Sequence, residues 1–380
     1  MNFDWTTEEK QLKQRISAIF DQDALLELDA LDRAEIPEIR NTTKRCLEKL
    51  AETGYLSLGV GPESRSETIT LIAGQEVVSA VSGALFLSVE VTARVFGGLL
   101  KGFGASDTVK QISRGLERGL LIGAVAVSES EGDQSPGYTP TSIHPDGDYH
   151  ILSGRKDFVT NASIADFIAV VAEAQAGQMI AVVDPASPGV ALGERLRTLG
   201  YDGLTVAGVN LKNVRVPNAL ALGPLTDRKP LEFLSQIQDL VLTMTSVGLM
   251  KSTLASAKKY SDTHIRGGRP VNRFQEIRFK LADMVTLAQT AELLAYRAGW
   301  LYSVADSQAS TVLHCAKVFA SEAAEQVTSM AMQIMAGPGY VSGNPVERAY
   351  REAKYAAIAG TTSEVARMSI ADDLLQTYKV

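Results

Sequence analysis

The sequence has few of the residues from which metal centres and disulfide frameworks are built. Its 380 residues include only two cysteines and four histidines. Cys46 and Cys315 lie far apart in apolar, helix-like segments, which argues against a disulfide or a cysteine zinc site. The histidines are scattered, and the nearest pair, His144 and His150, lacks a spacing typical of metal ligands. We therefore expect no metal site and a reducing compartment.

The sequence also lacks signals for nucleic acid, secretion and membranes. Its formal net charge is -7 and it has no long run of lysine and arginine, so we expect no nucleic-acid partner. The N-terminal segment 1–16 turns amphipathic at once, without the basic and then apolar pattern of a signal peptide. No apolar run looks long enough to cross a bilayer. These absences predict a cytoplasmic protein without membrane contact, whose partners are small molecules or proteins.

Common catalytic motifs are missing too. The chain contains no Walker loop and no G-x-S-x-G, which leaves a P-loop nucleotidase and a hydrolase elbow without support. The glycine-rich stretch GGLLKGFG at 97–104 does not have the G-x-G-x-x-G spacing and follows no clear strand. A Rossmann dinucleotide site is therefore not expected.

The pattern of apolar residues divides the chain into three zones. With 45% hydrophobic and 21% charged residues, the chain is long enough to form two or three domains. Residues 1–121 show helical periodicity, residues 122–228 form short β-rich runs bounded by turn residues, and residues 229–380 return to long helical patterns. Helices and strands that are segregated in this way predict an α+β fold.

Five segments, in this order, resemble motifs of the acyl-CoA dehydrogenase family, and they cover nearly the whole chain. They are AVAVSESEG at 124–132, GDYHILSGRKDFVTNASIADFIAVVA at 147–172, RVPNALALG at 215–223, GGRPVNRFQEIRFKLADM at 267–284 and QIMAGPGYVSGNPVERAYREAK at 333–354. The resemblance implies an N-terminal helical domain (1–121), a middle β-barrel-like domain (122–228) and a C-terminal four-helix bundle (229–380). It also implies a homotetramer or dimer.

The resemblance implies FAD as the cofactor. A flavin needs hydrogen-bond donors around its ring and an apolar surface against one face. Within KDFVTN, Phe158 can supply that surface and Thr160 a donor; the plain alternative is a β-hairpin with a core phenylalanine and a turn asparagine. Ser128 replaces the family's threonine and keeps its hydroxyl. The FAD contacts that the resemblance implies are Val127, Ser128, Phe158, Val159, Thr160, Arg266, Gln333, Gly337, Thr362 and Glu364.

The family's catalytic base is absent from both of its usual positions. Dehydrogenases of this family remove the proton α to a thioester carbonyl with a glutamate, which is a general base. Aligned without gaps, YREAKYAAIAGTTSEVARM places Gly360 where many members carry that glutamate, and Gln238 stands at the alternative position. The main-chain N–H of Gly360 can still bind the thioester oxygen, as the resemblance implies for this position.

Two carboxylates remain as candidates for a relocated base. Asp239 adjoins Gln238, but one helical step rotates a side chain by about 100°, which favours the alternative of a solvated acid near a helix N-terminus. Glu90 lies on a helix that lines the acyl pocket in the family; the alternative is a charge partner for Arg94, four residues on.

Further departures affect the substrate. Gln134 and Ser135 replace the residues that stand at the mouth of the pantetheine channel in the family, so the acyl group is carried either by coenzyme A or by a carrier protein. Two hypotheses follow. The first is a FAD-dependent acyl-thioester dehydrogenase-like enzyme, with electron-transfer flavoprotein as a further partner. The second is a catalytically degenerate subunit that pairs with an active paralogue in a hetero-oligomer.

Overall fold

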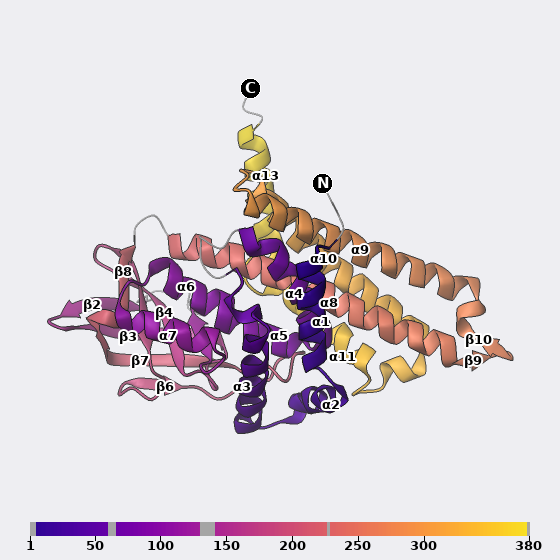
Figure 1. Ribbon diagram of the computed structural model, residues 1–380, viewed down its shortest axis with the longest axis horizontal. Coiled ribbons are helices and arrows are strands. Elements are labelled where there is room, and N and C mark those ends of the chain that lie inside the picture. The colour runs from indigo at the N-terminus through magenta and orange to yellow at the C-terminus, as the bar shows by residue number, and fades with distance from the viewer. Residues whose placement is uncertain (1–4, 60–65, 130–140, 226–228, 378–380) are drawn as a thin grey trace, which may run out of the picture.

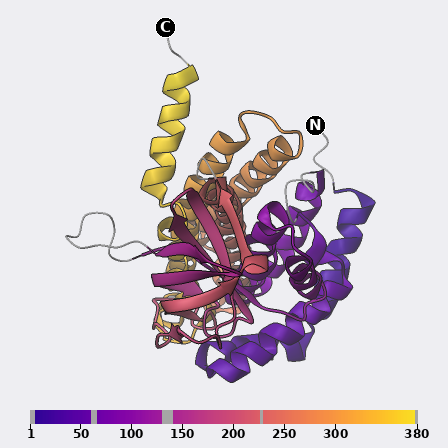
Figure 2. The ribbon, with the colours of Figure 1, turned by 90° about the vertical axis from the view of Figure 1, so that its left-hand side faces the viewer.

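A computed structural model describes residues 5–59, 66–129, 141–225 and 229–377 of the chain. The sheet forms one end of the molecule and the long helices extend away from it toward the other end (Figure 1). Figure 2 looks onto the sheet end, with the helices behind it. The order of helices, then strands, then helices confirms the predicted α+β fold.

The N-terminal helices pack around the junction between the sheet and the long C-terminal helices. A capping box starts the first of them, because the Thr6 hydroxyl accepts from the Glu9 N–H at 3.2 Å and the Glu9 carboxylate accepts from the Thr6 N–H at 2.7 Å. A π-helical segment, Val91–Phe96, joins α5 to α6. The helices are α1 (Thr7–Ile19), α2 (Gln22–Ala30), α3 (Ile36–Glu52), α4 (Thr68–Val81), α5 (Gly83–Glu90), α6 (Gly97–Phe103) and α7 (Asp107–Glu117).

The eight strands described between the two helical zones form one sheet. Their order is β6-β7-β3-β2-β4-β5-β8, and β1 pairs with β4 in parallel. The strands are β1 (Gly123–Ala126), β2 (Ser142–Asp146), β3 (Tyr149–Thr160), β4 (Phe167–Ala174), β5 (Gly177–Val183), β6 (Val190–Leu192), β7 (Val206–Pro217) and β8 (Ala221–Leu225). The short strands β2, β6 and β8 have no distinct sequence pattern, because they contain only three to five residues and β2 and β8 include a proline.

The C-terminal zone is built on three long helices, and α13 projects from it (Figure 1). The side chains that α9 buries are mostly alanines, and these small side chains let α8 and α10 pack closely against α9. The elements are α8 (Lys229–Thr263), the β9–β10 hairpin (Ile265–Arg266 and Arg269–Pro270), α9 (Gln275–Ser303), α10 (Ala309–Met335), α11 (Pro345–Glu352), α12 (Tyr355–Ile358) and α13 (Ser363–Thr377).

The expectation that no apolar run is long enough to cross a bilayer was wrong. Two helical stretches, Gly83–Phe103 and Glu232–Thr263, are long and apolar enough by composition to cross a bilayer. The structure buries 89% and 67% of their most apolar windows inside the fold. Core helices of a folded domain meet the same criterion as membrane spans, since both are long and mostly apolar.

Candidate functional site

A cavity of about 570 Å³ lies where the sheet meets the C-terminal helices. This volume is typical of sites for small molecules and cofactors. We refer to it as the junction cavity. Its walls bring together residues from the first helical zone, the sheet, α8 and the segment around α12. The lining residues are Val91, Val95, Val125, Val127, Ser128, Asp157, Phe158, Thr160, Thr198, Leu199, Gly200, Val206, Gln238, Arg351, Glu352, Lys354, Tyr355, Ile358, Ala359 and Gly360.

A bulge in β3 aims Phe158 into the junction cavity. The pairing of β3 with β7 shifts register between Lys156 and Val159, and Phe158 has a positive φ of 56°. A bulge of this kind turns one side chain away from the regular alternation of a strand. Val159 is 1% exposed and packs in the sheet core, whereas Phe158 is 64% exposed. An aromatic ring left this open in a cavity is suited to pack against a flat ligand.

Asn161 fastens the end of β3 to the first helical zone. Its side-chain amide donates to the carbonyls of Ser88 and Gly123 at 3.0 and 3.2 Å, and its amide oxygen accepts from the Ser88 hydroxyl at 2.8 Å. Asn161 is fully buried and has a positive φ of 66°, a conformation that asparagine tolerates better than most residues. The turn asparagine of KDFVTN therefore sets where Thr160 stands.

The end of β1 forms a second part of the same wall. Lys156 is buried, and its ammonium donates to the Val127 carbonyl at 2.9 Å and to the Glu129 carboxylate at 2.6 Å. The main-chain carbonyl of Ser128 accepts from the Asp157 N–H at 2.9 Å. Burial lowers the pKa of Lys156, although the bond to Glu129 opposes this shift. These contacts fix Val127 and Ser128 next to the bulge that carries Phe158.

Gln238 and Gly360, the two positions at which the resemblance implies a glutamate, both line the junction cavity. Gln238 lies on α8, and Gly360 lies in the loop between α12 and α13, where its φ is 61°. A Cβ atom built on Gly360 would lie 3.5 Å from Oε1 of Gln238 and 2.9 Å from Cδ1 of Leu242. A side chain at either position would therefore reach the same part of the junction cavity.

Tyr355, which the sequence interpretation missed, adds a hydroxyl to this cavity. Its hydroxyl lies near the Thr160 side chain, and its ring lies edge-on to Tyr201 with centroids 5.3 Å apart. Burial raises the pKa of Tyr355, and the Thr160 side chain offsets part of this increase. The phenol therefore keeps its proton at neutral pH. Only the apolar run around Tyr355 was visible in the sequence, and the partner from β3 was not.

Asp239 and Glu90 do not line the junction cavity. Asp239 is fully buried, and Nδ1 of His314 lies 2.9 Å from its carboxylate. Glu90 is fully buried and accepts from the Tyr55 hydroxyl at 2.6 Å and from the Gln75 amide at 2.7 Å. Its other neighbour is Arg94, 3.7 Å away, as the alternative interpretation expected. The geometry therefore gives no support to either carboxylate as the base.

The remaining predicted contacts lie outside this cavity. Arg266 is exposed in the β9–β10 hairpin, at the end of the molecule opposite the sheet (Figure 1). Gln333 and Gly337 are exposed at the end of α10. The Thr362 hydroxyl caps α13 by accepting from Val365 N–H at 3.3 Å, and Glu364 is exposed in the first turn of that helix. Gln134 and Ser135 fall outside the described residues.

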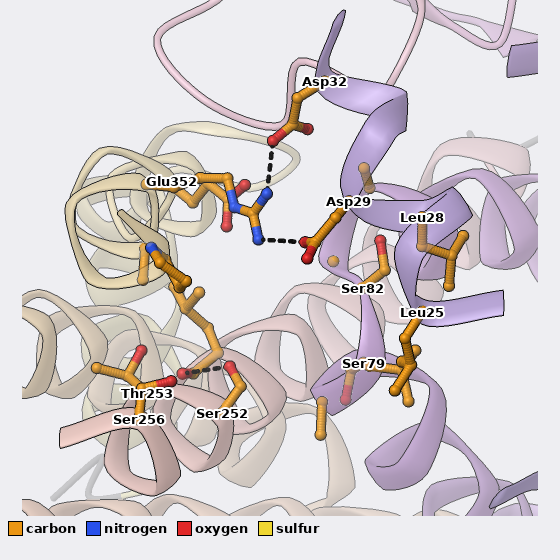
Figure 3. Close-up of a pocket in the computed structure, with 18 residues that line it drawn as sticks. Leu25, Leu28, Asp29, Asp32, Ser79, Ser82, Ser252, Thr253, Ser256 and Glu352 are labelled. Atoms are coloured by element: carbon orange, nitrogen blue, oxygen red, sulfur yellow. Dashed lines mark hydrogen bonds and ion pairs between the residues drawn. The ribbon is translucent and has the colours of Figure 1, made fainter. Parts of the chain in front are cut away.

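A second cavity, of about 270 Å³, is bounded by α2, α8 and α11 (Figure 3). Its charges are mutually satisfied, because Arg348 donates to Asp32 at 2.7 Å and to Asp29 at 3.0 Å. Glu352 lines both this cavity and the junction cavity. Burial raises the pKa of Glu352 to about 8, and nearby Arg348 offsets only part of the shift. The junction cavity presents the open ring of Phe158 and brings together the residues predicted from the sequence, so we take it as the candidate site.

Comparison with known proteins gives consistent matches. A sequence model of the acyl-CoA dehydrogenase C-terminal domain matches residues 238–375, and one of the middle domain matches residues 124–214. The chain is 30% identical to a 3-(aryl)acrylate reductase of Clostridium sporogenes, covering 97% of this chain and 99% of the relative. It is also 30% identical to the mitochondrial short-chain specific acyl-CoA dehydrogenase of Bos taurus, covering 88% and 83%. The structure of butyryl-CoA dehydrogenase from Megasphaera elsdenii superposes with a TM-score of 0.87 at 22% identity, covering 99% and 100%.

Proposed function

The chain belongs to the acyl-CoA dehydrogenase family, and on that premise we propose that it is a FAD-dependent oxidoreductase acting on the α,β carbon–carbon bond of an acyl thioester. The observation that supports this most is the junction cavity. Phe158 and Thr160 form its sheet wall, and Gln238 and Gly360 form its helical wall. We infer that it holds a planar cofactor beside a thioester.

The residues on the sheet wall fit a flavin. The Phe158 ring offers an apolar face, and the hydroxyls of Ser128 and Thr160 offer donors beside it. Bound FAD would supply the hydride transfer. Arg266, Gln333 and Gly337 are exposed and do not line the junction cavity, so they do not complete this site within one chain. We therefore propose that a second copy completes it, in a homotetramer or dimer.

The substrate would lie against the helical wall. We propose that the Gly360 N–H binds the thioester oxygen and stabilises negative charge on it. The carrier is coenzyme A or a carrier protein, and an electron-transfer flavoprotein would exchange electrons with the cofactor. Neither family position offers a carboxylate, because Gln238 and Gly360 occupy them.

Tyr355 is the proton-transfer group that we propose in place of the missing glutamate. A phenol that keeps its proton at neutral pH donates protons better than it accepts them. In the reductive direction the β-carbon receives a hydride and the α-carbon receives a proton, which Tyr355 would donate and water would replace. One relative is named as a 3-(aryl)acrylate reductase. We therefore propose that reduction of an enoyl thioester is the favoured direction.

The first test is to incubate the protein with FAD, desalt it and record its visible spectrum. Retained flavin peaks support the cofactor assignment, and a colourless protein contradicts it for a single chain type. The reduced holoprotein is then mixed with α,β-unsaturated thioesters on coenzyme A and on a carrier protein. Tyr355→Phe should slow flavin reoxidation by about a hundredfold with FAD still bound. The control is Tyr350→Phe, at a side chain that is 49% exposed and does not line the junction cavity.

A second candidate is a catalytically degenerate subunit that pairs with an active paralogue. The absence of a carboxylate at both Gln238 and Gly360 favours it. In that case the purified chain reacts with no thioester alone but raises the activity or the FAD content of a glutamate-bearing relative on mixing. Activity of the isolated chain would rule this candidate out.

A further inference from the structure

A buried lysine fastens the loop that carries Gly360. Lys317 on α10 is 1% exposed, and its ammonium donates a hydrogen bond to the main-chain carbonyl of Thr361. On the other side, the hydroxyls of Ser235 on α8 and Thr361 lie 2.9 Å apart. The peptide unit held by Lys317 lies two units from the one that carries the Gly360 N–H. Contacts from α8 and α10 therefore fix this turn of the loop.

A buried ammonium bound only to a neutral carbonyl needs a negative charge nearby. Burial lowers the pKa of Lys317, whereas the charges of Asp239 and Glu364 raise it. Glu364 is exposed, so solvent screens its charge. Asp239 is fully buried and acts through a lower dielectric. His314 and Lys317 lie three residues apart on α10 and so share one face of that helix. Because His314 contacts the Asp239 carboxylate, Asp239 lies on the face of α10 that carries Lys317. Asp239 is therefore the principal compensating charge.

Asp239 is itself held in place by α10. Nδ1 of His314 lies 2.9 Å from Oδ2 of the carboxylate, and His314 is 8% exposed. Oδ1 of Asp239 has no hydrogen-bond partner within the described part of the chain. A buried carboxylate oxygen without a donor is costly, so a compensating electrostatic role would explain why the carboxylate is retained.

We propose that Asp239, oriented by His314, is the counter-charge that holds Lys317 beneath the loop, and that these three side chains position the Gly360 N–H. They are positioning residues, because none of them lines the junction cavity. The inference depends on the proposed function only for what the Gly360 N–H binds.

Hydrogen exchange of the full chain, without substrate, tests the anchor directly. Lys317→Met and Asp239→Asn should each speed exchange of the loop amides in segment 359–366 by about tenfold, the effect of losing one charge-assisted hydrogen bond. Exchange in α9 should not change. The matched control is Lys258→Met on α8, whose side chain is 69% exposed and is paired with Asp262. That variant should leave loop exchange unaltered.

Two further variants keep the test decisive. His314→Asn removes the imidazole that orients the Asp239 carboxylate but keeps the charge of that carboxylate. It should therefore speed loop exchange by less than Asp239→Asn does. The double variant Lys317→Met with Asp239→Asn should exchange no faster than the faster single variant, because the two residues act as one unit. Additive effects in the double variant, or wild-type loop exchange in Lys317→Met, would overturn the proposal. A loosened loop in a protein that reacts with no thioester would leave the anchor standing and refute the proposed function instead.

Discussion

Gln238→Glu should convert the junction cavity into one that removes an α-proton. The change replaces an amide by an isosteric carboxylate on a helix, so it introduces no backbone strain. The side chain is half-buried, and partial desolvation raises the pKa of a carboxyl group toward neutrality, which suits a base. A positioned general base contributes about a hundredfold to ten-thousandfold to a rate. We expect acceleration in that range for flavin reduction by saturated acyl thioesters.

Gly360→Glu should reach the same part of the cavity at a structural cost. Its φ of 61° lies in the left-handed region, where a residue with a Cβ atom costs roughly 1–2 kcal/mol. The new Cβ would also meet Cδ1 of Leu242 at 2.9 Å, so that flexible side chain must move. Gly360→Ala separates the two effects, because it has the same backbone cost and adds no base.

The assay combines urea denaturation with anaerobic flavin reduction by saturated acyl-CoA of several chain lengths. Gln238→Glu should keep wild-type stability and gain activity. Gly360→Glu should lose stability by about as much as Gly360→Ala and gain less activity. If Gln238→Glu binds FAD yet neither reduces it nor exchanges the α-protons of any thioester with deuterated water, the inferred convergence of the two positions is wrong.

Three further outcomes are expected. Glu90→Gln leaves the buried Arg94 without its charge partner and should lower the free energy of unfolding by about 3–5 kcal/mol in urea denaturation. Phe158→Ala removes the open ring of the cavity and should weaken FAD binding by roughly tenfold in a fluorescence titration. Glu352→Gln removes a carboxyl group whose pKa rises from 4.5 to about 8 on folding. The folded protein holds that proton more tightly than the unfolded chain, so the free energy of unfolding of the wild type falls as pH rises between these values. The free energy of unfolding of the variant, relative to that of the wild type, should therefore increase by at most roughly 1.4 kcal/mol per pH unit.

Each of these outcomes can fail in a specific way. Unchanged stability of Glu90→Gln would show that the neutral side chain satisfies Arg94 and Tyr55 equally well. Unchanged FAD affinity in Phe158→Ala would place the flavin elsewhere. For Glu352→Gln, a stability difference that does not vary between about pH 5 and pH 7.5 would show that this carboxyl titrates at its ordinary value.

The fold could be predicted from the sequence because periodicity and motif order pointed to the same architecture. Helical spacing in the first and last zones and β-rich runs between them predicted the order of helices, sheet and helices. The motifs then indicated which known fold has that order. The short strands β2, β6 and β8 were not predicted individually, since three to five residues are too few for a clear alternation. The apolar helices of the core were not recognised as long enough to span a bilayer, because polar residues interrupt them.

The sequence located the cavity residues that neighbour one another in the chain but not those that meet only in the fold. Phe158 and Thr160 come from one strand, and one motif predicted that both belong to the site. The contact of Tyr355 with Thr160 joins segments nearly two hundred residues apart. The direction in which Asp239 points depends on where α10 places His314. No local pattern contains that information.

If the proposed FAD site is correct, the open ring of Phe158 makes the amount of folded protein depend on the supply of FAD. If FAD fills the junction cavity, then a chain made without it leaves an aromatic side chain 64% exposed between two parts of the fold that a ligand would otherwise join. A ligand that binds only the folded form stabilises it by mass action. Cells short of riboflavin would then hold less of this protein even when its gene is fully expressed, because proteases remove the unfilled form first.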